Sequence, residues 1–181
     1  MSTVMVALLR GVNVGASTKV PMADLRRVVA GCGYGDVRTY VNSGNVVLTA
    51  DDPDPDAVAD RLRAACAEAF PVRPDVVVRT RDELHAVVAA NPFLDRDDDP
   101  THHHVVFLPG HDRPVAPDLD VAAFHPEDLA LGAREVYLYL PFGMGRSALA
   151  TRLAARKGER GTARNWRTVT TLASLADAAG G

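Results

Sequence analysis

The chain has 181 residues, of which 47% are apolar and 24% charged, and its net charge is −3. This composition is typical of a soluble globular protein with one large domain or two small ones. The sequence contains neither the uninterrupted apolar run of about 18 residues that a membrane span needs nor a secretion-signal pattern. We therefore expect a cytoplasmic protein that acts without a membrane partner.

The two cysteines, Cys32 and Cys66, fall at apolar positions of predicted helices. Such thiols are typical of packed cores, and two of them are too few for a disulfide or zinc framework. The sequence predicts neither a metal site nor a cofactor.

Charge is unevenly distributed along the chain. Residues 146–167 carry seven Lys or Arg side chains against one acidic residue, Glu159, so this segment is +6 and the remainder is −9. A basic segment on an acidic body favours a local anion site over a general nucleic-acid coat. A solvated helical face explains the same segment equally well.

An apolar run over residues 5–9 predicts a buried strand, and residues 10–15 predict the loop that follows it. Asn13 lies between two glycines of this loop. Such a loop would expose backbone N–H groups to an anion, and Arg10 would add a bidentate guanidinium. The alternative is a tight turn in which the arginine pairs with an internal carboxylate. The pattern matches neither a P-loop nor a dinucleotide fingerprint.

Hydrophobic periodicity predicts a ferredoxin-like β-α-β-β-α-β domain over residues 1–80. Its elements are expected as a strand at 5–9, a helix from Pro21 to Cys32, a hairpin of strands at 37–41 and 46–48, a helix over 58–69 and a strand at 75–79. In the usual strand order, four-one-three-two, strand one is antiparallel to strands three and four. The end of strand one and the turn at 42–45 are therefore expected side by side.

Residues 81–181 are predicted as a second α+β domain, a divergent echo of the first half without a recognisable sequence repeat. Its elements are expected as a helix opened by the capping box Thr80–Glu83 and ended at Asn91, a strand at 104–108, a short helix near 119–124, strands at 129–131 and 135–140, and helices at 147–156 and 164–178. The whole chain is thus predicted to be α+β.

The segment Asn42–Asn45 has the composition that turns require. Its predicted position beside strand one would allow Ser43 and Asn45 to offer a hydroxyl and an amide to a ligand. The sequence places no histidine next to Ser43, so we do not expect a serine nucleophile.

Near the C-terminus, Thr162 is predicted as the N-cap of the last helix. Arg164 and Asn165 would then lie in its first turn, where the helix dipole favours an anion and disfavours a cation without a negative neighbour. Trp166, the only tryptophan, is more simply explained as a packing anchor than as a stacking platform.

Two further patterns are weaker. His102-His103-His104 beside the acidic residues 95–99 suggests a metal site, but no third ligand follows at a fixed spacing, so a solvated loop is the preferred interpretation. The segment Gly143–Ser147 resembles a phosphate-cradling turn, although an ordinary turn is the simpler explanation.

Three segments resemble a bacterial family known as domain of unknown function 1697. They are Ala7–Gly15 followed by Pro21-Met22, Val37–Val46, and Thr162–Val169. The resemblance implies an α+β chain with a ferredoxin-like N-terminal part, and it implies no established activity or cofactor. The family pattern has Gln before its Ser-Gly-Asn turn, where this chain has Asn42, so a catalytic role is not expected there.

We expect a protein that binds a small anionic ligand, phosphate-bearing or nucleotide-like, at a rim built from these three segments. The expected ligand-binding residues are Arg10, Asn13, Lys19, Arg38, Ser43, Asn45, Arg164, Asn165 and Trp166. RNA is disfavoured because the predicted middle strands bring few aromatic side chains, with Tyr40 on strand two. The alternatives are a hydrolase or transferase that uses the same cleft, which lacks an evident general base, and a protein-interaction module.

Overall fold

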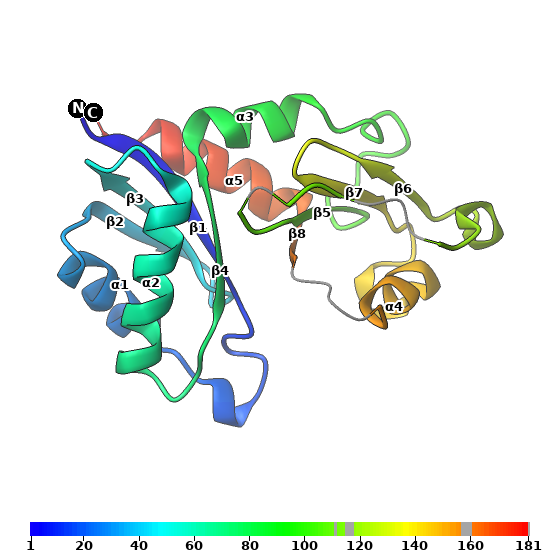
Figure 1. The fold of residues 1–181 in the computed structure, drawn as a ribbon. Coiled ribbons are helices and arrows are strands. Elements are labelled where there is room, and N and C mark those ends of the chain that lie inside the picture. Colours follow the sequence, from blue (N-terminus) through cyan, green and yellow to red (C-terminus); the bar gives the residue numbers. More distant parts are fainter. Residues whose placement is uncertain (111, 115–117, 157–160, 181) are drawn as a thin grey trace. The chain divides into compact units, whose positions relative to one another are not determined.

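The protein is described by a computed structural model in which residues 1–110, 112–114, 118–156 and 161–180 are placed. The chain divides into two compact units (Figure 1). Unit 1 consists of Met1–His85 and Thr171–Gly181, and unit 2 of Ala86–Thr170. In the basic segment, Lys157, Glu159 and Arg160 lie outside the described residues.

Unit 1 has the strand order β2-β3-β1-β4, in which every neighbouring pair is antiparallel. This is the order predicted for a ferredoxin-like unit, and that prediction is confirmed. The elements are β1 (Thr3–Arg10), η1 (Ala16–Thr18), α1 (Met22–Gly31), β2 (Gly35–Tyr40), β3 (Asn45–Ala50), α2 (Pro55–Ala69) and β4 (Asp75–Thr80).

The core of unit 1 lies between its sheet and the two helices α1 and α2 (Figure 1). Alternate residues of β1 face these helices, whose apolar side chains recur at helical spacing. Asp54 begins α2 by accepting a hydrogen bond from the N–H of Asp56, and Pro55 occupies the first turn, where its missing N–H has no cost. The buried core residues include Met5, Ala7, Leu9, Leu25, Val29, Val46, Leu48, Val58, Leu62, Cys66, Val76 and Val78.

Two helices cross the boundary between the units: α3 (Arg81–Ala89) and α5 (Trp166–Asp177). The predicted capping box of α3 is present, because the N–H of Glu83 donates to Thr80 Oγ1 at 3.1 Å and Glu83 Oε2 accepts from the N–H of Thr80 at 2.8 Å. In unit 1, His85 of α3 lies 2.8 Å from Asp177 of α5.

Unit 2 has the strand order β6-β7-β5-β8, again with antiparallel neighbours throughout. Its smaller core cluster contains Leu138, Leu140 and Leu149. The elements are β5 (His103–Phe107), η2 (Val121–Phe124), β6 (Asp128–Leu131), β7 (Glu135–Tyr139), η3 (Met144–Arg146), α4 (Ala148–Ala154) and β8 (Thr162–Asn165). The predicted hairpin is present as β6 and β7, and both units together form the predicted α+β chain.

The end of unit 2 differs from the sequence prediction. Thr162 is not a helix cap, and Arg164 and Asn165 do not lie in the first turn of a helix, because all three belong to β8. Backbone pairing with β5 and the burial of alternate residues favour a strand here, and α5 begins only at Trp166.

The segment Gly143–Ser147 forms a short 3-10 turn and the start of a helix. Ser147 caps α4 by accepting a hydrogen bond from the N–H of Ala150 at 2.8 Å. The ordinary turn is therefore the arrangement found. Within the placed residues, no helix combines the length and apolarity that crossing a membrane requires.

Candidate functional site

The loop after β1 is held by Asn13. Its side-chain amide donates to the carbonyl oxygens of Val20 at 2.9 Å and Asn42 at 2.7 Å, and its Oδ1 accepts from the N–H of Val20 at 2.8 Å. Asn13 has φ 54°, a left-handed conformation that Asn adopts more readily than most residues. The side chain of Asn13 thus serves as framework, closing the loop and joining it to the turn after β2.

Thr18 accepts hydrogen bonds from backbone N–H groups of the same loop. Its Oγ1 accepts from the N–H groups of Val14 and Gly15, both at 3.0 Å, and its carbonyl accepts from the N–H of Asn13 at 2.8 Å. These three amides are therefore engaged inside the loop. An anion at this position would be bound by side chains rather than by the backbone cradle that the glycines suggest.

Asn45 holds the turn between β2 and β3. It is fully buried, and its Nδ2 donates to the Tyr40 carbonyl at 3.1 Å and to Ser43 Oγ at 2.9 Å. The strand register places Asn45 opposite Leu8 of β1. The turn therefore lies beside the end of strand one, as the predicted topology requires.

Gly44 allows the turn and the loop to meet closely. The N–H of Leu9 donates to the Gly44 carbonyl at 2.8 Å. Gly44 has φ +78°, and a Cβ built on it would lie 2.6 Å from Val12 Cγ2 and 2.8 Å from Leu9 Cβ. Both the backbone conformation and the space require glycine here.

The register also places two candidate cations on one face of the sheet. Tyr40 pairs with Asn45, which pairs with Leu8. Arg10 lies two residues beyond Leu8, and Arg38 lies two residues before Tyr40. Because alternate strand residues share a face, Arg10 and Arg38 lie on the face opposite α1 and α2. Both side chains are exposed.

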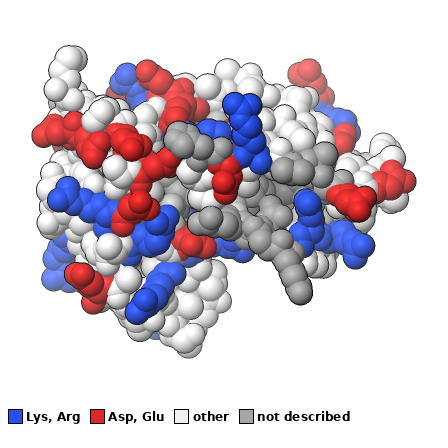
Figure 2. Space-filling view, in the orientation of Figure 1, with Lys and Arg blue, Asp and Glu red and all other residues white. Residues whose placement is uncertain are grey.

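Lys19 and Ser43 add exposed polar groups at the end of the sheet where Arg10 lies, whereas the register places Arg38 level with Val6, four residues before Arg10. Lys19 lies between Thr18 and Val20, both of which bond to Asn13. We call Arg10, Lys19, Arg38 and Ser43 the basic rim. On the surface that Figure 2 presents, Lys and Arg are interspersed with Asp and Glu, which fits local anion sites better than a continuous basic coat.

The C-terminal candidates serve the structure of unit 2. Arg164 is only 8% exposed, and its Nη1 donates to Thr162 Oγ1 at 2.7 Å and to the Ala163 carbonyl at 2.9 Å. Burial lowers the pKa of its guanidinium to about 10. Asn165 Oδ1 accepts from the N–H of Thr168 at 2.9 Å, so Asn165 caps α5. Trp166 is half-buried and begins that helix.

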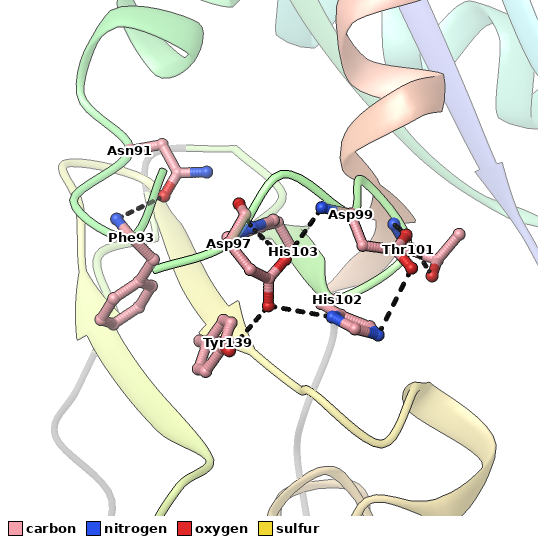
Figure 3. Close-up of polar contacts among 8 residues, drawn as sticks. All are labelled: Asn91, Phe93, Asp97, Asp99, Thr101, His102, His103 and Tyr139. Carbon is pink, nitrogen blue, oxygen red and sulfur yellow. Dashed lines mark hydrogen bonds and ion pairs between the residues drawn. The ribbon is translucent and has the colours of Figure 1, made fainter. Parts of the chain in front are cut away.

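A second polar cluster, which the sequence interpretation treated as a solvated loop, surrounds Asp97 in unit 2 (Figure 3). Asp97 Oδ2 lies 2.9 Å from His102 Nδ1 and accepts from the Tyr139 hydroxyl at 2.7 Å. Burial alone would raise the pKa of the Asp97 carboxyl, but hydrogen bonds from His102, Tyr139 and the Asp99 backbone lower it to about 2. An ionised carboxylate only accepts, so His102 Nδ1 donates to Asp97, and on the other side of the ring His102 Nε2 lies 3.5 Å from Asp99 Oδ2.

Two buried histidines adjoin this cluster. His103 is 2% exposed, and its Nε2 donates to the Asp97 carbonyl at 3.0 Å. Within the described residues, His103 Nδ1 and His104 Nδ1 are buried without a hydrogen-bond partner. Burial, followed by the electrostatic effect of the neighbouring His103 and His102 imidazoles, lowers the pKa of His104 to about 4.

Sequence spacing could not assemble the cluster because Tyr139 comes from a strand far along the chain. The signal that was present is the close spacing of Asp97 and His102. Over the placed residues, no group of three or more His, Cys, Asp or Glu side chains is arranged to hold a metal ion.

Comparison with known proteins supports the family assignment. The family model described as "Protein of unknown function (DUF1697)" matches residues 1–137. The chain belongs to this family. The matched region contains the first two of the three resembling segments and ends before Thr162–Val169.

A solved structure shows the same fold. It is that of the conserved bacterial protein SP0830 from Streptococcus pneumoniae, with a TM-score of 0.77 and 22% sequence identity over 98% of this chain and 99% of that one. At this identity the likeness establishes the fold alone. Among curated proteins, no match to the chain was found.

Proposed function

We propose that this DUF1697 protein binds a small anionic ligand, phosphate-bearing or nucleotide-like, at the basic rim of unit 1. The observation that carries the proposal is the strand register, which puts exposed Arg10 and Arg38 on one face of the sheet. We restrict the proposal to unit 1, because Arg164 and Asn165 are already engaged in β8 and in the cap of α5.

The physical argument combines the charge of the arginines with a backbone that is already held in place. Arginine guanidinium groups bind phosphate through paired N–H donors, and a charge-assisted hydrogen bond contributes about 1.5–3 kcal/mol. Exposed side chains lose part of this gain when they are ordered. The bonds of Asn13 and the close approach at Gly44 reduce that loss, because the backbone that carries the cations is already fixed.

Calorimetric titration of the full chain with AMP and with pyrophosphate, at low and at physiological salt, tests this proposal. We expect Arg10→Ala and Arg38→Ala each to weaken binding about tenfold, and binding to fall as salt rises. Arg27→Ala is the matched control, because Arg27 is an exposed arginine of α1 paired with Asp24. Affinity that survives the loss of both rim arginines would contradict the proposal.

A second candidate function is acid–base catalysis at the Asp97 cluster, favoured by the orientation of His102. An ionised carboxylate that orients an imidazole is the arrangement of a catalytic histidine and its orienting group, and here the second ring nitrogen of His102 faces the Asp99 carboxylate at 3.5 Å. A screen with phosphate esters, carboxyl esters and amides would test it. Turnover abolished by both His102→Gln and Asp97→Asn supports this function, whereas a silent screen counts against it.

A further inference from the structure

We infer that the ligand of the basic rim carries a planar apolar group beside its phosphate, as a nucleotide does, and that Val14 and Val41 contact its base. This inference rests on the proposed function and adds the residues that would distinguish a nucleotide from a bare phosphate.

The first observation is the exposure of two valines next to the rim cations. The side chain of Val14 is 77% exposed and that of Val41 is 52% exposed. The two residues flank the hydrogen bond from Asn13 Nδ2 to the Asn42 carbonyl, so the same contact that joins loop and turn brings them into one region. A pair of exposed apolar side chains beside cations suits a ligand with both an apolar and an anionic part.

The second observation is the backbone of Val41. Its φ is 49°, a left-handed conformation that is strongly unfavourable for a β-branched residue. Glycine or asparagine would adopt this conformation without strain, and the same turn uses glycine at residue 44 with φ +78°. A strained and exposed valine therefore contributes little to folding, which points to a role for its apolar surface.

The third observation is the charge around the pair. Arg10 is the last residue of β1 and Lys19 follows η1, so they lie at the two ends of the segment that carries Val14, and Arg38 lies on the strand that leads to Val41. A nucleoside monophosphate presents an anion and an aromatic ring within one small molecule. It can therefore engage the cations and the valines together, whereas inorganic phosphate and pyrophosphate can engage only the cations.

The test compares AMP with pyrophosphate on the wild-type chain and on Val41→Asn. We expect the asparagine variant to melt at the same or a higher temperature, because the strain is relieved. We expect it to bind AMP about fivefold more weakly through the lost apolar contact, and to bind pyrophosphate unchanged. Val14→Ser should act in the same direction, and Leu131→Asn, which removes an exposed leucine from unit 2, should alter neither affinity.

The possible outcomes distinguish a failure of the valine contacts from a failure of the proposed anion binding. If AMP and pyrophosphate both bind the wild type and neither valine variant changes their ratio, the role of the valines is wrong while the proposed function stands. If neither ligand binds the wild type, the proposed function is wrong and this inference falls with it.

Discussion

Unit 1 and unit 2 are built on sheets that correspond strand for strand. In both, the order is second-third-first-fourth and every neighbour is antiparallel. The registers also correspond. Leu8 of β1 pairs with Asn45 of β3, and Phe107 of β5 pairs with Glu135 of β7 at the equivalent position. Val6 of β1 pairs with Arg79 of β4, and Val105 of β5 pairs with Arg164 of β8 at the equivalent position.

The correspondence extends to contacts at the end of the first strand. The N–H of Leu9 donates to the Gly44 carbonyl at 2.8 Å, and the N–H of Leu108 donates to the Arg134 carbonyl at 3.0 Å. Each hairpin turn is held by the buried polar residue that follows it. In unit 1 this is Asn45, and in unit 2 it is Glu135, whose carboxylate accepts from two turn amides.

The last strand of each unit ends in the same way. Arg79 and Arg164 are both buried and donate from Nη1 to the carbonyl of the preceding residue. The next residue then caps a helix: Thr80 accepts from an N–H three residues later, and so does Asn165. A strand, a buried arginine, a cap and a helix thus form a repeated structural motif.

The units differ in the helices and polar side chains that are attached to the shared sheet. Unit 1 has two full helices on its sheet, whereas unit 2 has the four-residue turn η2 and the short helix α4. Pro109 stands where unit 1 has Arg10, although the following glycine has positive φ in both. Unit 2 in turn carries the Asp97 cluster and its histidines. Function is therefore best sought in these non-repeated polar groups, because the shared residues hold the turns, strand ends and helix caps of the fold.

The largest expected effect distinguishes a glycine at which an added Cβ would clash from a glycine that is needed only for its positive φ. Gly44→Ala should destabilise the protein by about 3 kcal/mol, because it adds a steric clash to left-handed strain. Gly11→Ala and Gly110→Ala, at equivalent positions with open space around the added Cβ, should each cost about 1 kcal/mol. Urea unfolding measures all three, and equal losses at residues 44 and 11 would show that the close approach does not matter.

The next effect is a pH dependence that arises from His104 in unit 2. The folded state keeps His104 neutral, with its pKa at about 4 against 6.5 ordinarily, so the unfolded state takes up this proton first. Stability is thus fully present above pH 6.5 and falls, by at most about 3 kcal/mol, as the pH drops to 4. The sequence of unit 1 before His85 contains no histidine.

Unfolding in urea between pH 7 and pH 4 measures this dependence, with Trp166 fluorescence as a probe within unit 2. His104→Leu removes the titrating group and should flatten the curve over that interval. An unchanged slope in this variant would assign the acid sensitivity to other groups.

Much of the frame could be predicted from sequence because it depends on local periodicity. The N-terminal order followed from apolar runs, helical periodicity and glycines, and the contact between the β1 loop and the 42–45 turn followed from that order. Strand β8 was missed because a four-residue strand has no distinctive period and Thr162 resembles a helix cap. The repeat was also missed, since equivalent positions carry different residues, such as Asn45 and Glu135.

The candidate site was predictable only in part. Sequence placed Arg10 and Ser43 near one another through topology, but it could not show that Asn13 and Thr18 engage the loop's own amides. The Asp97 cluster depends on Tyr139 and on the tautomer of His102, which are properties of the folded chain. Long-range contacts of this kind leave no trace in local spacing.

The smallest expected effect tests whether the two helix caps are equivalent. Thr80→Ala and Asn165→Ala should each destabilise the protein by about 1 kcal/mol, because each leaves one N–H of the first helical turn without its side-chain partner. Ser174→Ala, an exposed change in α5, should stay within about 0.5 kcal/mol of the wild type. A large difference between the two cap variants would weaken the correspondence between the units.

The most direct test of the anion-binding account is an NMR titration of the labelled full chain with AMP. The account predicts that amide shifts change in the β1 loop and the β2–β3 turn of unit 1, residues 10–19 and 38–45, while the equivalent turn of unit 2 at residues 132–135 stays unchanged. Shifts that gather in unit 2, or a spectrum that does not respond to AMP, would contradict it.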